Sequence, residues 1–197
     1  MNRLILAAAL LAASFGLAAQ TAKPPALTVK PLAEKKVPDL PNGELFWRIE
    51  NFPGLEQAKA AAGQWSLAAE SDGKAWLFTL GPSGGATPGG TKVAEVGPIP
   101  RIQAPLYLLR INEASGPKGA VTSVHSHPGS ETFYPLRGEQ RMHGPKGVLV
   151  MKAGEPVIGQ GEQPMQVSST GDTDLHSLVM FVVDATRPFS SPAKFDH

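Results

Sequence analysis

Apolar and polar residues alternate in short runs along most of this chain, and turn residues separate the runs. A period of two predicts β-strands, because successive side chains of a strand point to opposite faces. The final run is different, since Leu178 to Val183 (LVMFVV) is continuously apolar, as in a strand covered on both faces. The strands expected from these patterns are 44–50, 65–70, 74–80, 92–96, 106–112, 121–127, 131–134, 140–143, 148–151, 156–158, 163–169 and 175–184.

Glycine and proline limit the helical content of the chain. It has 21 glycines and 19 prolines in 197 residues, which leaves few places for long helices. One short helix is expected over 55–62, ending at Gly63, and Ser71-Asp72-Gly73 predicts a hairpin. The stretch 81–90 (GPSGGATPGG) reads as a loop, either a solvated connector or a cover over a pocket. Together these features predict an all-β domain built from many short strands.

Two histidines and a glutamate stand close together within residues 119–138 (GAVTSVHSHPGSETFYPLRG). His125 and His127 are two positions apart on an expected strand, so their side chains should share one face. Pro128-Gly129-Ser130 is a turn signal, and a tight turn would lay Glu131 beside the two imidazoles. Two neutral nitrogens and one carboxylate form the facial set that holds non-haem iron and related divalent metals.

The spacing of these residues, G-x5-H-x-H-x3-E-x6-G, resembles the first sequence motif of the cupin superfamily, in its single-domain type. The resemblance implies a cupin or jelly-roll barrel of two antiparallel sheets. It also implies that His125, His127 and Glu131 ligate a divalent metal ion, which in this reading is Fe, Mn, Zn or Ni.

A second cupin motif, G-x5-P-x-G-x2-H-x3-N, is degenerate in this chain. Gly154 matches its first glycine, but Met165 stands where the motif has its histidine. Three alternatives follow. The three ligands act alone with Met165 as an apolar pocket wall, another side chain such as His143 or Gln163 is a fourth ligand, or the barrel has lost its metal. If Met165 were itself a ligand, copper would be favoured, because a thioether is a soft donor.

Strand parity suggests further pocket residues. If His143 faces inward, Arg141 does too, and its guanidinium would suit a substrate carboxylate or phosphate. The alternative is an exposed Arg141 at the edge of a hairpin. Tyr134 and Gln140 are candidate hydrogen-bonding residues of the pocket by the same reasoning.

The chain divides into five expected segments. Residues 1–19 read as a secretory signal, with Arg3 before a short apolar run, so we expect a periplasmic or secreted protein without stable membrane anchoring after cleavage. Residues 20–43 are expected to form a linker or an arm that supports a homodimer. Residues 44–91 should form strands that extend the barrel, 92–185 the cupin barrel, and 186–197 a C-terminal tail.

The charge balance and the lack of cysteine limit which binding partners and covalent links we expect. Lys and Arg number 18 and Asp and Glu 17, so the loss of Arg3 with the signal would leave 17 of each. This neutral balance, without a basic cluster, favours neither nucleic acid nor an anionic membrane as a partner. The sequence has no cysteine, so it can form neither a disulfide nor a lipid-anchored cysteine.

The function that these observations favour is an exported cupin metalloprotein that binds a small polar ligand at a His/His/Glu site. In its catalytic form it would be a metal-dependent oxidoreductase of dioxygenase type. Two alternatives remain: a non-enzymatic barrel that binds ligand without metal, and a metal-dependent isomerase or lyase. Cupins of all these kinds share one barrel, so the fold alone does not choose among them.

Overall fold

The computed structural model describes residues 23–159 and 161–195, and these form fourteen strands and one short helix. The all-β prediction is confirmed. The predicted signal segment 1–19 and the last two residues of the predicted tail lie outside the described residues. Within the described part of the chain, no helix has both the length and the apolar character that crossing a membrane requires.

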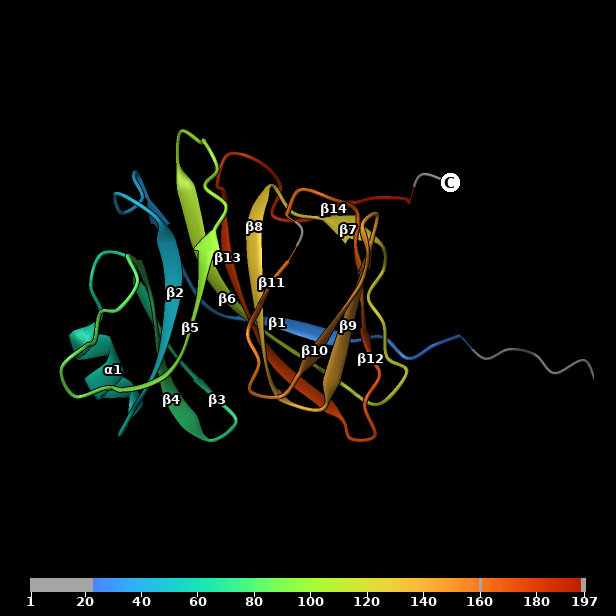
Figure 1. Ribbon diagram of the computed structural model, residues 1–197, viewed down its shortest axis with the longest axis horizontal. Helices are drawn as coiled ribbons and strands as arrows, with labels where there is room; N and C mark the ends of the chain where they lie inside the picture. Colours follow the sequence, from blue (N-terminus) through green and yellow to red (C-terminus); the bar gives the residue numbers. More distant parts are fainter. Residues whose placement is uncertain (1–22, 160, 196–197) are drawn as a thin grey trace, which may run out of the picture.

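A five-stranded antiparallel sheet forms the centre of the molecule (Figure 1). Its middle strand, β13 (Leu175–Asp184), carries the continuous apolar run. Alternate residues of that run lie in two different cores, Leu178, Met180 and Val182 in one and Val179, Phe181 and Val183 in the other. The prediction of a strand covered on both faces is therefore confirmed. The strand order is β1 (Thr28–Val37), β6 (Tyr107–Gly116), β13, β8 (Gly129–Arg137) and β11 (Val157–Ile158).

A smaller sheet faces one side of the central sheet and completes the barrel (Figure 1). It has the order β10 (Gly147–Lys152), β9 (Glu139–Gly144) and β12 (Gln166–Ser169). Met142, Met151 and Val167 from this sheet pack against Phe133 and Phe181 of the central sheet. At one end of the barrel, β7 (His125–Ser126) pairs with β14 (Ser191–Pro192).

A four-stranded sheet covers the other side of the central sheet (Figure 1). Its order is β3 (Ser66–Ser71), β4 (Lys74–Gly81), β2 (Leu45–Phe52) and β5 (Thr91–Ile99). Trp47, Trp76 and Phe78 from this sheet share one core with Leu109 and Leu178 of the central sheet. The helix α1 (Leu55–Ala61) packs on the outer face of the four-stranded sheet. It is one residue shorter than the helix expected over 55–62.

The strands depart from the expected domain division in two places. The segment 20–43, expected as a linker or an arm, contains β1, which pairs with β6 of the same chain from Thr28 to Val37. This edge strand is exposed along most of its length and is rich in lysine. Lysine at a sheet edge prevents pairing with other chains. The exposed lysines also interrupt the alternation of apolar and polar residues by which a strand is recognised in the sequence. The predicted barrel boundary at residue 92 falls inside β5, a strand of the separate four-stranded sheet.

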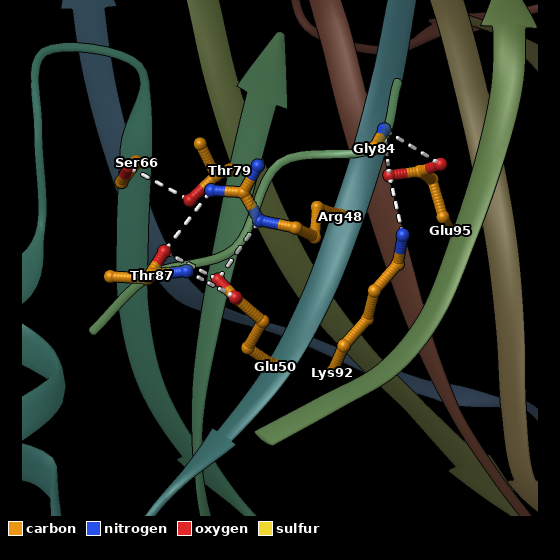
Figure 2. A network of polar contacts seen from close by, with 8 residues as sticks. All are labelled: Arg48, Glu50, Ser66, Thr79, Gly84, Thr87, Lys92 and Glu95. Atoms are coloured by element: carbon orange, nitrogen blue, oxygen red, sulfur yellow. Dashed lines mark hydrogen bonds and ion pairs between the residues drawn. The ribbon is translucent and has the colours of Figure 1, made fainter. Parts of the chain in front are cut away.

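The glycine-rich loop 81–90 is fixed to the four-stranded sheet (Figure 2). The backbone N–H of Thr87 donates to Oε1 of the fully buried Glu50 at 2.7 Å, and the Thr87 hydroxyl donates to Oε2 at 2.6 Å. Nε of Arg48 lies 3.1 Å from Glu50 Oε2, close enough for an ion pair though not aligned for a hydrogen bond. This loop is thus a fixed connector, and none of its residues lines the cavity described next.

Candidate metal and ligand site

A cavity of about 340 Å³ lies inside the barrel, between the central sheet and the three-stranded sheet. Its wall is mostly apolar, and a small number of polar side chains interrupts it. This combination is typical of small-molecule sites, which use few polar groups to orient a ligand. The apolar wall includes Leu27, Phe133, Val167, Val179, Phe181 and Phe189, and the polar residues are Asn112, Thr122, Ser123, His125, His127, Glu131, Gln140 and Ser190.

The three residues predicted as metal ligands all line this one cavity. The predicted strand 121–127 is shorter than expected, since regular pairing covers only His125 and Ser126. The imidazole rings of His125 and His127 nevertheless lie with their centroids 5.0 Å apart and nearly perpendicular. The chain then turns, and Glu131 follows as the third residue of β8.

The first and last glycines of the motif occupy turn positions that other residues rarely adopt. Gly119 has φ +85° and Gly138 has φ +75°, both in the left-handed region that favours glycine. A Cβ at Gly138 would also lie 3.0 Å from the carbonyl oxygen of Asp174. These two turns bound the segment that carries the histidines and the glutamate, so the motif glycines are explained by the fold.

Backbone carbonyls orient both imidazole rings. His125 Nδ1 lies 2.8 Å from the carbonyl oxygen of Ser123, and His127 Nδ1 lies 2.6 Å from that of Phe189. Because a carbonyl oxygen only accepts hydrogen bonds, each Nδ1 carries a proton, so Nε2 is the nitrogen that has the lone pair when the ring is neutral. This is the arrangement found in metal-ligating histidines, whose second nitrogen donates to a carbonyl or carboxylate.

Burial keeps His127 neutral. Only 6% of the residue is exposed. Burial lowers the pKa of His127 to about 4, with smaller contributions from His125 and Arg110, and outweighs the opposing effect of the hydrogen bond to Phe189. A neutral imidazole is the form that binds metals.

Glu131 is buried without a compensating partner. It is 2% exposed, and its Oε1 has no hydrogen-bond partner in the part of the chain that the structure describes. Burial raises the pKa of Glu131 to about 8. Gly159 makes room for this carboxyl group, since a Cβ there would lie 2.8 Å from Oε1. An unpaired buried carboxylate is costly, so this position calls for a cation or a proton.

The donor set fits a divalent metal in kind, because two histidines and one glutamate line the same cavity. As the side chains lie, however, no three His, Cys, Asp or Glu residues of the described ranges 23–159 and 161–195 are close enough together to hold a metal ion. Closing the site around a metal would therefore require the side chains to move inward.

Comparison with protein-family models and with curated proteins gave no match. Among solved structures, a cupin-like protein from Thermotoga maritima is similar with 17% identity and a TM-score of 0.39, over 43% of this chain and 64% of that chain. A cupin 2 domain-containing protein from Halorhodospira halophila has 15% identity and a TM-score of 0.38, over 44% and 59%. An oxalate oxidase in complex with the substrate analogue glycolate has 18% identity and a TM-score of 0.36, over 42% and 45%. The match spans less than two thirds of each of these three chains.

Two facing antiparallel sheets enclose the cavity, and β7, the turn that follows it and β8 carry the motif residues that line it. The fold is therefore an all-β jelly-roll barrel, the fold that the first motif led us to expect. The low similarity to the solved structures adds nothing about family, ligand or activity.

Met165, at the histidine position of the second cupin motif, pairs with the first histidine through the backbone. The N–H of Met165 donates to the carbonyl oxygen of His125 at 2.8 Å, and the N–H of His125 donates back at 2.9 Å. The Met165 side chain is buried in the core between the two barrel sheets and is not one of the cavity-lining side chains. Gln163 is exposed and borders a separate surface hollow beside Gly159. Neither residue therefore faces the cavity.

Three further candidate pocket residues, Arg141, His143 and Tyr134, lie away from the cavity. On β9 the apolar Met142 points into the barrel, so its neighbours Arg141 and His143 point out. Arg141 Nε lies 3.3 Å from the Glu139 carboxylate, and the exposed His143 ring lies 5.1 Å from that of Phe195. Tyr134 lies on the opposite face of β8 from Glu131, where it meets Trp76 edge-on in the other core.

Gln140, a candidate hydrogen-bonding residue, lines the cavity because it shares the inward face of β9 with Met142.

The C-terminal segment is a part of the site that the sequence did not predict. Phe189 lines the cavity, and its ring centroid lies 4.7 Å from that of His127 and 4.9 Å from that of Phe181. The guanidinium carbon of Arg110 lies 4.2 Å from the centroid of the Phe189 ring, which is a cation–π distance. The only sequence signal was a pair of phenylalanines, Phe189 and Phe195, in a proline- and serine-rich tail. Residues 186–197 were expected only as a C-terminal tail, and Phe189 and Ser190 of this tail form part of the cavity wall.

Proposed function

We propose that this cupin binds one divalent metal ion through His125, His127 and Glu131 and holds a small ligand beside it in the cavity. The observation that carries the proposal is the buried Glu131 carboxylate, whose Oε1 has no partner among residues 23–159 and 161–195. It shares the cavity with two imidazoles whose Nδ1 atoms are already bonded to carbonyls. A bound cation would offset the cost of burying the carboxylate, which amounts to several kcal/mol for an unpaired ion.

The surrounding residues have defined roles in this proposal. The carbonyl groups of Ser123 and Phe189 hold the rings so that Nε2 is the free nitrogen. The apolar wall, including Phe133 and Phe181, keeps water away from the donors and strengthens their electrostatic effect. A bound divalent metal would supply Lewis-acid chemistry here, or redox chemistry if it is iron, which is the basis of a dioxygenase-type activity.

The donor set also bears on the choice of metal. Because the Met165 side chain packs in the core and does not line the cavity, the proposed ligands are nitrogen and oxygen only. Such a set suits Mn(II), Fe(II), Ni(II) or Zn(II) better than Cu(I), which prefers sulfur.

Calorimetric titration of the metal-free protein with Mn(II), Fe(II), Zn(II) and Cu(I) tests the proposal. We expect one site per chain in the wild type and a loss of affinity of at least about 100-fold in His125→Ala, because two remaining ligands hold a labile ion poorly. His143→Ala is the matched control, since His143 lies exposed on the outer face of β9. A wild type that binds none of these metals, or a His125→Ala variant that binds them as the wild type does, would contradict the proposal.

A second candidate is a cupin that binds its ligand without metal. The separation of the three donor groups among the described residues favours it. In this case Glu131 would hold a proton and donate a hydrogen bond to the ligand, as its raised pKa of about 8 allows near neutral pH. Ligand binding that is unchanged by a chelator and lost in Glu131→Ala would support this candidate over the metalloprotein.

A further inference from the structure

Gln140 is a buried polar residue that the proposed metal chemistry does not use. It is 0% exposed, it points inward from β9, and it lines the cavity. Neither Oε1 nor Nε2 of its amide has a hydrogen-bond partner among the described residues. A buried amide without partners costs about 1–3 kcal/mol relative to a satisfied one. Burying Gln140 therefore lowers the free energy of unfolding, and a methionine or leucine at this position would avoid that cost.

The other polar side chains of the cavity wall differ from Gln140, because Ser123 and Ser190 are exposed to solvent and Asn112 and Thr122 already make hydrogen bonds. Asn112 Oδ1 accepts a hydrogen bond from Arg110 Nε at 2.8 Å, and the Thr122 hydroxyl accepts one from the Val167 N–H at 3.0 Å. Among the buried polar residues of the cavity wall outside the three proposed metal ligands, Gln140 is thus the one whose amide donor and acceptor both lack a partner within residues 23–159 and 161–195. Its inward neighbours on β9 and β10, Met142 and Met151, are apolar.

We infer that the Gln140 amide binds a planar group of the ligand that carries an N–H or O–H beside a carbonyl oxygen. Primary amides, undissociated carboxylic acids and lactams have such a group. The two amide atoms of Gln140 would pair with it in the manner of an amide dimer, donor to acceptor and acceptor to donor. The mostly apolar remainder of the 340 Å³ cavity would take an aromatic or aliphatic body attached to that group.

This inference rests on the ligand-binding part of the proposed function and not on the metal. Benzamide and acetophenone test it, because they have nearly the same shape and differ by an NH₂ in place of a methyl group. A cavity that only offers apolar contacts would prefer the less polar acetophenone. A cavity in which Gln140 pairs with the ligand would prefer benzamide, by about tenfold for one additional buried hydrogen bond.

The experiment is a titration of the full metal-free chain, followed by ¹H–¹⁵N correlation spectra. The side-chain amide signals of Gln140 are assigned by their absence in Gln140→Met. We expect benzamide to shift these signals and to bind about tenfold more tightly than acetophenone. In Gln140→Met the preference should reverse, whereas Gln163→Met, a change at an exposed glutamine outside the cavity, should behave as the wild type does.

A structural role for Gln140 would give a different result. Ser169 lies opposite Gln140 in the pairing of β9 with β12, and its hydroxyl is also buried without a partner in the described chain. If a bond between Gln140 and Ser169 were the reason for the glutamine, Gln140→Met would lower the melting temperature and leave the probe preference unchanged. We expect instead an equal or higher melting temperature, since methionine fits the apolar neighbours.

The outcomes for the metal and for the amide are separable. Zn(II) affinity should be equal in the wild type and in Gln140→Met. Failure of Zn(II) to bind either protein, together with a benzamide preference that depends on Gln140, would overturn the metal site and support the inference. A wild type that binds acetophenone as tightly as benzamide, or that binds neither, would overturn the inference whether or not it binds metal.

Discussion

Glu113 joins the four-stranded sheet to the barrel, and its replacement should destabilise the protein in a pH-dependent way. Its Oε1 lies 2.8 Å from Lys30 Nζ on β1, and its Oε2 lies 2.9 Å from His176 Nε2 on β13. The hydroxyl of Ser71, at the end of β3, also donates to Oε2. One buried carboxylate thus connects strands of two sheets.

The magnitude follows from the pKa of this carboxyl group. Burial alone would raise it, but hydrogen bonds from Lys30, Ser71 and His176 outweigh burial and lower the pKa of Glu113 from 4.5 to about 2. Such a shift corresponds to about 3–4 kcal/mol of folding free energy at most. Because the folded pKa is the lower one, this stabilisation is fully present above pH 4.5. It is lost as the pH falls from 4.5 toward 2.

Urea denaturation of Glu113→Gln and the wild type, at pH 7, 5, 4 and 3, measures this contribution. We expect the variant to be about 2–3 kcal/mol less stable at pH 7 and 5, and the difference to shrink steadily below pH 4.5. The exposed Glu70 of β3 supplies a matched control, since Glu70→Gln should change stability by less than about 0.5 kcal/mol. A difference that is constant from pH 7 to pH 3 would refute the linkage. A difference below about 0.5 kcal/mol at pH 7 would refute the magnitude.

Two further substitutions test the site and the loop. Gly159→Ala should lower the affinity for divalent metal by at least about tenfold, because the new Cβ would meet Glu131 Cγ at 2.5 Å. Gly81→Ala is the control and should leave the metal affinity unchanged, because its Cβ would meet no atom within 4 Å. Equal effects of Gly159→Ala and Gly81→Ala on the affinity would count against the placement of Glu131. Thr87→Val removes the 2.6 Å hydrogen bond to the buried Glu50 carboxylate and should cost about 1–3 kcal/mol in urea denaturation. No measurable cost would mean that this bond does not hold the loop.

The parts of the fold that the sequence predicted are those set by local chemistry. The run from Leu178 to Val183 indicated burial on both faces because no polar residue interrupts it, and each face of β13 lies in its own core. The Ser71-Asp72-Gly73 turn joins β3 and β4 as predicted. Asp72 has φ +52°, a conformation that aspartate tolerates better than most residues.

The features that the sequence analysis missed are of two kinds. One is a contact between residues far apart in the sequence, and the other is the phase of β9, that is, which of its alternate residues point inward. The Phe189 carbonyl bonds His127, which lies 62 positions earlier, and no local pattern in the tail encodes that contact. The phase of β9 was readable, because the apolar Met142 requires its neighbours to point outward, yet the ligand chemistry of His143 suggested the opposite. At β9, burial of the apolar residue decided the phase.

Long-range ¹H–¹⁵N spectra of the histidine rings during a Zn(II) titration test the metal site most directly. We expect Zn(II) to shift the Nε2 signals of His125 and His127 together, while each Nδ1 stays protonated through its bond to a backbone carbonyl. The Nε2 signals of His143 and His176, which do not line the cavity, should stay in place. Zinc that shifts neither His125 nor His127, or that shifts His143 instead, would contradict a metal centre in this cavity.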